Sequence, residues 1–378
     1  MWHDLTSDQE LLRDTTARFL ADHVSLAKQR KLRDDPAGFE PGYWSSGGEL
    51  GWCMLLGSET DGGGSVSGRG AVDLALIAYE FGKHAAPGPL VDCNVVVLAL
   101  SGQQGDLQQQ ALGEVLMGQA IASSCLGAAP WQLPGDAAVS IRRDGGDVII
   151  DGVVKPVESA AQAAYFIVTG QGEGGMTQVL VPAGTAGVSV KPLKAIDVSR
   201  RFGKVSFDGA RLPASAVVGE FGQAEAAVAR QIQHAAVILS AESVGAMDAA
   251  FEMTLDWMFN RYTFGRALAS YQALKHRMAD MKSWLEASHA IADAAAEAVA
   301  DDSGNAAELV SSAKSYIGIQ GPELCQEGVQ LHGGIGVTYE HDLHFFLRRV
   351  TLDALLYGTP AEHRRWLAAM QIGQEKAA

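Results

Sequence analysis

Two segments in the second half of the chain combine residue types that can bind a phosphorylated ligand. The first is Asn260 to Arg266, which contains Arg261 and Thr263, and the second is Gln330 to Gly336, in which His332 precedes two glycines. An arginine beside a small hydroxyl residue, where one helix gives way to another, can present a guanidinium and backbone N–H groups to a pyrophosphate. Paired glycines let the backbone approach a ligand closely. Together the two segments indicate a pyrophosphate site.

Each segment also has a plainer explanation. On its own, a His-Gly-Gly tripeptide is more often a turn, and a surface arginine is usually solvated. Three aromatic residues at helical spacing are explained more simply as core than as a stack on a cofactor; they are Trp257, Phe259 and Phe264. Four arginines near the C-terminus are explained more simply by an exposed basic face near a helix end than by contacts with the phosphates of a ligand; they are Arg348, Arg349, Arg364 and Arg365.

The histidines and cysteines do not form the pattern of a metal site. His341 and His344 are three residues apart, but no carboxylate or cysteine pattern accompanies them or His363. The four cysteines are far apart and are explained best as small buried hydrophobes; they are Cys53, Cys93, Cys125 and Cys325. We therefore predict no metal and a reducing, cytoplasmic location.

The elements that must position these segments follow from two changes in sequence texture. Residues 1–120 favour helices, and residues 121–220 contain short β-branched runs between glycine turns. Residues 221–378 are alanine-rich and amphipathic, with long helices expected at about 223–259, 270–300 and 306–330. The fold class is therefore α+β, with an N-terminal helical domain, a middle antiparallel β domain and a C-terminal helical bundle.

Local signals mark some of the element ends. Thr6 or Ser7 is expected to cap the first helix, with Glu10 near its third position as in a capping box. Asp144-Gly145 and Asp151-Gly152 are expected to form hairpin turns in the β domain.

Composition limits the class of function. The chain has 378 residues, of which 47% are apolar and 19% charged, so it can form a substantial core. A formal charge of −15 argues against nucleic acid or an anionic membrane as a general partner. No apolar stretch reaches the roughly 18 residues of a membrane span, and Met1 to Arg13 lacks the pattern of a secretory signal.

Taken together, the two segments resemble the signatures of the acyl-CoA dehydrogenase family. The first matches R-x-T-F-G followed by the Gln272 to Met281 run, and the second matches Q-x-x-G-G. The resemblance extends over nearly the whole chain, and Gly334 to Asp342 is most similar to the branch that acts on steroid side-chain thioesters. It implies an enzyme that oxidises acyl-CoA at the α and β carbons, passing electrons to an electron-transfer flavoprotein or a similar acceptor.

The resemblance also implies how the cofactor is bound. In this family FAD lies extended across a subunit interface, and these two segments contact the flavin cofactor held mainly by the neighbouring subunit. The implied cofactor-binding residues are Arg261, Thr263, Phe264, Gln272, Gln330, His332, Gly333 and Gly334. They form what we call the trans half of the site.

The catalytic carboxylate of the family is missing from its usual places. The reaction needs a base to remove the α proton while the flavin accepts hydride from the β carbon. In the family's Y-E-G-T segment this chain has Tyr357 in place of the acid, and at the alternative position on the preceding helix it has Ala235, followed by Ala236. Glu242, about two turns further on, is a weak candidate base and is explained more simply as a buried structural partner.

The β domain departs from the family pattern as well. The loop that contacts flavin and thioester is expected near Ser123 to Asp136, and the strand along the isoalloxazine appears as Lys155 to Ser159, without its tryptophan. Ser124 and Ser159 can still offer a hydrogen bond. We call this the cis half of the site, and the losses fall on it alone.

Three readings follow from this one-sided loss. The first is a subunit that lacks the base and completes the FAD site of a homologous, base-bearing partner in an α2β2 heterotetramer, as the resemblance to the steroid branch implies. The second is a self-sufficient homotetrameric dehydrogenase that uses Glu242 as an atypical base. The third is a non-catalytic structural relative that binds neither FAD nor acyl-CoA.

Overall fold

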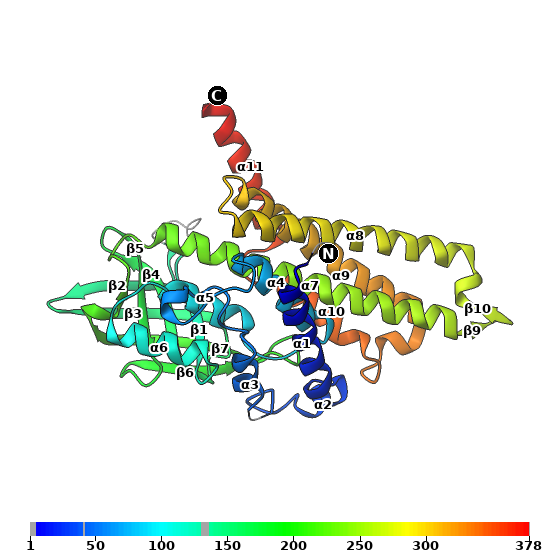
Figure 1. Ribbon diagram of the computed structural model, residues 1–378, viewed down its shortest axis with the longest axis horizontal. Helices are drawn as coiled ribbons and strands as arrows, with labels where there is room; N and C mark the ends of the chain where they lie inside the picture. The colour runs from blue at the N-terminus through cyan, green and yellow to red at the C-terminus, as the bar shows by residue number, and fades with distance from the viewer. Residues whose placement is uncertain (1–4, 41, 130–135, 378) are drawn as a thin grey trace.

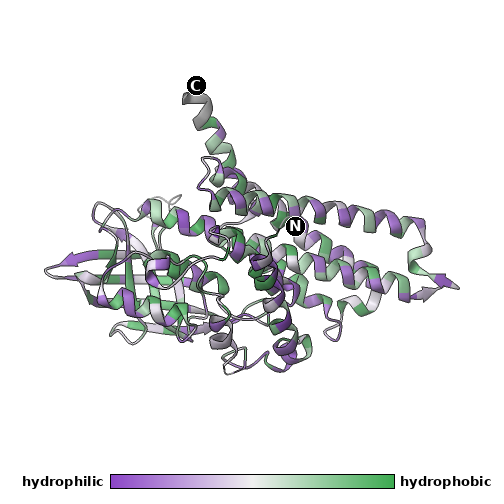
Figure 2. Cartoon of the chain, viewed as in Figure 1, coloured by the Kyte–Doolittle hydropathy of each residue, from purple (hydrophilic) through white to green (hydrophobic). Residues whose placement is uncertain are grey.

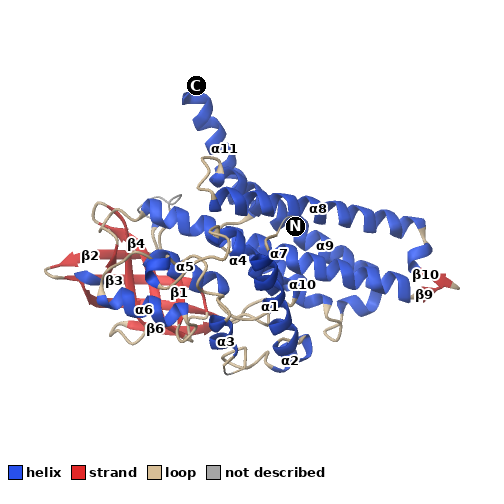
Figure 3. Cartoon of the chain, viewed as in Figure 1, coloured by secondary structure: helices blue, strands red, loops and turns tan. Residues whose placement is uncertain are grey.

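The computed structural model describes residues 5–40, 42–129 and 136–377. Strands gather at one end of the molecule, and the long C-terminal helices extend to the other end. There a short β-ribbon connects two antiparallel helices (Figures 1 and 3). The N-terminal helices lie between these two parts and against both of them. The predicted fold class, with a β region between two helical regions in sequence, is confirmed.

The N-terminal region is helical, with its central helix α4 buried along most of its length. Its helices are α1 (Ser7–His23), α2 (Leu26–Lys31), α3 (Tyr43–Glu49), α4 (Gly70–Lys83), α5 (Leu90–Leu100) and α6 (Asp106–Leu116). Thr6 caps α1 as predicted, but the capping box closes with Gln9 rather than Glu10. The Gln9 amide sits at the third helical position and accepts from the Thr6 backbone N–H at 3.1 Å.

The strands form a sheet in the order β6-β7-β3-β2-β4-β5-β8, with β1 also paired to β4. They are β1 (Ile121–Leu126), β2 (Val139–Asp144), β3 (Asp147–Glu158), β4 (Ala163–Gly172), β5 (Gly175–Pro182), β6 (Val188–Leu193), β7 (Phe202–Pro213) and β8 (Val217–Val218). Most pairings are antiparallel, as predicted, but β1 and β2 both pair with β4 in parallel. The sheet is therefore mixed.

One of the two predicted hairpin turns is present. Asp144 pairs with Asp147 across the turn that joins β2 to β3. Asp151-Gly152 instead lies inside β3, where the register shifts between Ile150 and Gly152, so the second prediction is wrong. Gly152 has a φ of 141°, and a Cβ there would lie 2.2 Å from the carbonyl oxygen of Ala138. Glycine is needed here for a bulge and a close approach, not for a turn.

The C-terminal region is a helical bundle whose long helices match the predicted ranges. It contains α7 (Glu225–Asn260), α8 (Gln272–Ala300), α9 (Ala306–His332), α10 (Leu343–Asp353) and α11 (Pro360–Ala377), with the ribbon β9 (Tyr262–Thr263) and β10 (Arg266–Ala267) between α7 and α8. Helix α7 packs on α4, α8, α9 and α10, whereas α11 projects from the body (Figure 1). Hydrophilic and hydrophobic residues alternate along these helices, as one buried face requires (Figure 2).

The cysteines behave as the sequence indicates. All four are buried and free, and burial raises the pKa of the Cys93, Cys125 and Cys325 thiols. Within the described ranges, no helix is both long and apolar enough to cross a membrane. The same residues contain no group of three or more side chains able to hold a metal ion.

Candidate functional site: two half-sites of different size

The trans half of the site is an open cavity of about 550 Å³ where the end of α7 meets the end of α9. It is lined by Trp257, Arg261, Thr263, Leu268, Leu331, His332, Gly333, Gly334 and Ile335. Helix α7 ends at Asn260 and α9 at His332, so the residues that follow both helices meet here. Five of the eight predicted cofactor residues therefore share one cavity although they come from two distant segments.

The other three predicted residues lie near this cavity but do not line it. Gln272, at the start of α8, is exposed and lies 2.9 Å from the His276 ring nitrogen. Gln330 is exposed on α9. Phe264 is 93% exposed and adopts a left-handed φ of 54° at the turn of the ribbon. None of these three side chains is covered by the rest of the chain.

Trp257 and His332 form the wall of the open cavity, and each has a buried nitrogen without a hydrogen-bond partner among the described residues. Their rings stack with centroids 5.2 Å apart. The Nδ1 of His332 donates to the Gly328 carbonyl at 2.8 Å, which leaves Nε2 as an acceptor. Burial lowers the pKa of His332, so the ring is neutral near pH 7. The wall of the cavity thus contains one buried donor and one buried acceptor that the described residues leave unpaired.

The residues of this cavity fit a dinucleotide cofactor such as FAD. Arg261 supplies an exposed guanidinium above the Trp257 ring, 5.7 Å from its centroid, which suits a pyrophosphate. Neither Gly333 nor Gly334 has an atom within 4 Å of the place of a Cβ, so the backbone is open to a ligand. Sequence reasoning assigned Trp257 to the core. Its position one turn before Arg261 on α7 is the signal that could have placed it here.

The aromatic prediction fails for the two residues beyond Trp257. Phe259 is 62% exposed on the last turn of α7, and Phe264 is 93% exposed in the turn between β9 and β10. Helical spacing alone does not bury a residue once the helix has no partner on that face.

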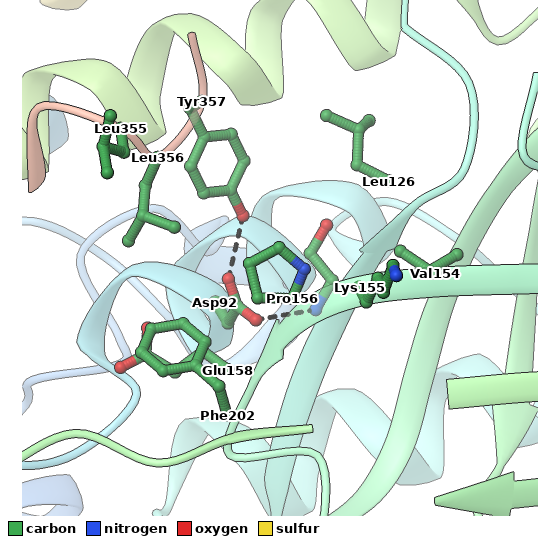
Figure 4. A pocket seen from close by; sticks show the side chains of 11 residues that line it. Asp92, Leu126, Val154, Lys155, Pro156, Glu158, Phe202, Leu355, Leu356 and Tyr357 are labelled. Atoms are coloured by element: carbon green, nitrogen blue, oxygen red, sulfur yellow. Dashed lines mark hydrogen bonds between the residues drawn. The ribbon is translucent and has the colours of Figure 1, made fainter. Parts of the chain in front are cut away.

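The cis half of the site is a small cavity of about 200 Å³ between the sheet and the C-terminal loop (Figure 4). Its lining comprises Asp92, Ser124, Leu126, Val154, Lys155, Pro156, Glu158, Phe202, Leu355, Leu356 and Tyr357. Pockets that hold ligands of drug size usually measure about 300–1,000 Å³. Residues 130–135, within the predicted contact loop, lie outside the described residues, and Ser159 is buried without lining the cavity.

Tyr357, which the sequence resemblance places where the family carries its acid, is fixed by a buried carboxylate. Its hydroxyl donates to Asp92 at 2.8 Å, and the second oxygen of Asp92 accepts from the Ser124 N–H at 3.1 Å (Figure 4). Burial, together with the charge of Asp92, raises the pKa of Tyr357 well above its usual value. The phenol therefore stays protonated near pH 7 and cannot replace the missing base.

Asp92 is the functional-looking residue that sequence reasoning missed. It is 4% exposed, and burial together with the nearby Glu158 raises the pKa of its carboxyl to about 7. An unfolded aspartate has a pKa of about 3.9. The folded chain thus holds an extra proton between these pH values, and the stability that this proton contributes is lost as the pH rises towards 7.

Asp92→Asn is expected to remove this loss because the amide does not titrate. Between pH 5 and pH 8 the variant should gain about 3 kcal/mol in unfolding free energy relative to the unsubstituted protein. Denaturant unfolding at the two pH values measures the change. Asp34→Asn, at a side chain that is 95% exposed, is the matched control and should show no such difference. An equal effect of Asp92→Asn at both pH values would contradict the assignment.

Glu242, the weak candidate base, lies in neither cavity. It is 3% exposed, and its oxygens pair with Arg349 at 2.5 Å and with Arg200 at 3.4 Å. The two arginines also bind carboxylates from the sheet and from α10, so the cluster joins the domains. These contacts favour a structural role for Glu242 over that of a base. Arg349 is 0% exposed, so the prediction that it lies on an exposed basic face is wrong.

Two protein-family models match this chain. Residues 6–118 match the model "Acyl-CoA dehydrogenase, N-terminal domain", and residues 225–372 match "Acyl-CoA dehydrogenase, C-terminal domain". The acyl-CoA dehydrogenase IpdE2 of Mycobacterium tuberculosis is 27% identical over 361 residues, covering 95% of this chain and 96% of the relative.

Solved structures share the fold at lower identity. A variant of the steroid ACAD Tcur3481-Tcur3483 is 23% identical with a TM-score of 0.86, covering 98% of this chain and 99% of that chain. The ChsE4-ChsE5 complex from Mycobacterium tuberculosis is 22% identical with a TM-score of 0.86, covering 99% and 98%. A glutaryl-CoA dehydrogenase from Mycobacterium smegmatis, solved with FADH2, is 19% identical with a TM-score of 0.83, covering 98% and 95%.

Proposed function

The chain belongs to the acyl-CoA dehydrogenase family, and on that premise we propose that it is the subunit of a heteromeric enzyme that completes the FAD site of a base-bearing partner. Enzymes of this family are oxidoreductases that act on CH–CH groups. The observation that carries the proposal is the contrast between the two half-sites. The trans cavity measures about 550 Å³ and is lined by Arg261 and two open glycines, whereas the cis cavity measures about 200 Å³ and has Tyr357 at the expected position of the base.

In the proposed site this chain binds and orients the cofactor but does not take the substrate proton. When bound, the flavin accepts a hydride from the β carbon of the thioester. Arg261 neutralises the pyrophosphate, and the backbone at Gly333 and Gly334 approaches it closely. Trp257 supplies an indole N–H donor and His332 a ring-nitrogen acceptor. The base and most of the acyl-CoA pocket come from the partner.

Two considerations support a bulky acyl group and a heteromeric assembly. The Gly334 to Asp342 run is most similar to the steroid side-chain branch. Two of the similar solved structures each pair two named proteins, Tcur3481 with Tcur3483 and ChsE4 with ChsE5, and the first pair is described as a steroid ACAD. We therefore propose a steroid side-chain or similarly bulky acyl-CoA as substrate, α2β2 assembly, and an electron-transfer flavoprotein or similar acceptor, in the cytoplasm.

The two other readings gain less support from the structure. A self-sufficient enzyme needs a base, and Glu242 is held by two buried arginines away from both cavities. A purely structural relative has no need of an open cavity with an unpaired indole N–H and an unpaired imidazole nitrogen.

Expression of this chain alone and with a homologous, base-bearing subunit tests the proposal. Alone, the chain should show no acyl-CoA dehydrogenase activity with an artificial electron acceptor, because the two carboxylates that line its own cis half, Asp92 and Glu158, are held by Tyr357 and Arg200. The co-expressed complex should be active. Activity of the chain alone that Glu242→Gln abolishes would overturn the proposal in favour of the self-sufficient enzyme.

A further inference from the structure

We infer that Arg30 is a positioning residue for FAD binding: from the N-terminal helical region it fixes the loop that forms one side of the open cavity. The inference rests on the proposed function. The loop in question comprises residues 333–342, which we call the glycine loop. It begins with Gly333 and Gly334 at the cavity and ends at Asp342, just before α10.

Arg30 lies on α2 and reaches the glycine loop with all three guanidinium nitrogens. Nε donates to the Tyr339 carbonyl at 3.2 Å, and Nη2 donates to the Glu340 carbonyl at 2.9 Å. Nη1 pairs with the Asp342 carboxylate at 2.7 Å. The side chain is 23% exposed, so this ion pair is partly shielded from solvent. Two directed hydrogen bonds to successive carbonyls, with an ion pair beside them, fix both the position and the direction of the loop backbone.

The contacts of Arg30 continue into the aromatic residues around it. Its guanidinium lies 5.2 Å from the centre of the Phe345 ring and 5.9 Å from that of Tyr339. The Tyr339 ring stacks on His344 with centroids 4.7 Å apart. These contacts place the end of the glycine loop between α2 and α10.

His341, at the fixed end of the loop, contacts a residue of the cavity wall. His341 lies between two of the residues that Arg30 binds, and its ring centroid is 4.4 Å from that of His332. His332 in turn stacks on Trp257. These are the two wall residues whose buried nitrogens lack a partner in the described part of the chain. Displacing residues 339–342 therefore displaces the face of the cavity that offers polar groups to a ligand.

Helix α2 is itself anchored, which makes it a fixed support for Arg30. The loop that follows α2 is held by Arg201, which donates from Nε to the Asp35 carbonyl at 2.8 Å. The same guanidinium donates to the Val198 carbonyl at 2.9 Å, beside the sheet. The support of the open cavity thus runs from the β region through α2 to the glycine loop.

The test uses the co-expressed complex with Arg30→Ala, Arg30→Lys and Lys28→Ala. Lys28 lies on the same helix and carries the same charge, but its polar contacts are with Ser25, His23 and Glu40. The dissociation constant of FAD is expected to rise about tenfold in Arg30→Ala, which loses charge-assisted bonds that hold the loop. It should rise less in Arg30→Lys, which keeps one charged donor, and by less than about twofold in Lys28→Ala.

Hydrogen exchange supplies the second readout, because it does not depend on catalysis. The backbone amides of Thr338 to Leu343 should exchange faster in Arg30→Ala than in the unsubstituted complex, with FAD present or absent. An unchanged dissociation constant overturns the inference whether or not exchange is faster, and so does an equal rise in Lys28→Ala. If the unsubstituted complex binds no FAD, the proposed function fails and the inference falls with it. If the unsubstituted complex binds FAD and the Arg30 variants bind it with the same dissociation constant, the inference fails and the proposed function stands.

Discussion

Arg349→Met is expected to lower the unfolding temperature of the complex by about 10 °C, corresponding to a loss of about 4 kcal/mol. Arg349 is fully buried and binds Asp197 at 2.6 Å, Glu242 at 2.5 Å, the Ser199 hydroxyl at 2.7 Å and the Ala86 carbonyl at 2.9 Å. Methionine fills a similar volume but leaves two buried carboxylates without this partner. Removing one member of a buried ion pair costs more than the pair itself contributes.

The buried cluster around Arg349 contains more acidic than basic side chains, so losing one positive charge leaves carboxylates unpaired. It contains the carboxylates Glu158, Asp197, Glu242 and Asp353 and the cations Arg200, Arg349 and Lys314. Burial and the charge of Glu242 already raise the pKa of Asp353. Although burial acts in the other direction, the pairing with Arg349 holds the pKa of Asp197 below its usual value. The four carboxylates already outnumber the three cations, and Arg349→Met would leave four carboxylates with two cations.

Arg348→Met is the matched control for this prediction. Arg348 is the preceding residue on α10, and it donates to the Ile196 carbonyl at the protein surface at 2.8 Å. A surface substitution of this kind should shift the unfolding temperature by no more than about 2 °C. Differential scanning calorimetry of both complexes makes the comparison. Equal shifts would contradict the structural role given to the buried cluster, and with it the structural role of Glu242.

Arg261→Ala is expected to weaken FAD binding by the complex about 10- to 100-fold while leaving its unfolding temperature without FAD nearly unchanged. The guanidinium is exposed and lines the open cavity, so it contributes to ligand binding and little to the fold. A charge-assisted hydrogen bond to a phosphate is worth about 1.5–3 kcal/mol. Arg261→Lys should recover part of the loss, since it restores the charge but not the bidentate geometry.

Arg266→Ala is the control for Arg261→Ala. Arg266 lies in the ribbon that directly follows Arg261, but its guanidinium lies 3.8 Å from the centre of the Tyr271 ring and does not line the cavity. Fluorescence titration of each apo complex with FAD gives the dissociation constants. Equal affinities of the Arg261→Ala and unsubstituted complexes would show that the open cavity is not the FAD site.

The features that could be predicted from the sequence are those carried by neighbouring residues. The long helices follow from amphipathic runs, and the bounds of α7, α8 and α9 fall within two residues of the predicted ends. The cavity residues Arg261, Thr263, Gly333 and Gly334 were found because each pair lies directly beyond a helix end. Two helix ends that meet in a bundle bring such short motifs together.

The features that could not be predicted depend on residues far apart in the chain. Asp92 meets Tyr357 across 265 positions, and neither residue type by itself signals a partner. The pattern near Arg349 indicated a basic face, because the carboxylates that bury it come from the β region and α7. Arg30 likewise contacts residues more than 300 positions away. Pairing of this kind depends on the tertiary fold and leaves no local signal.

The measurement that tests the central claim most directly is the mass and flavin content of the purified protein, alone and co-expressed with the homologous subunit. The account predicts a 2:2 assembly with about one FAD per heterodimer, since only one of the two cis halves can hold the flavin. It also predicts that the chain alone binds no FAD. A homotetramer of this chain with one FAD per protomer would contradict the account.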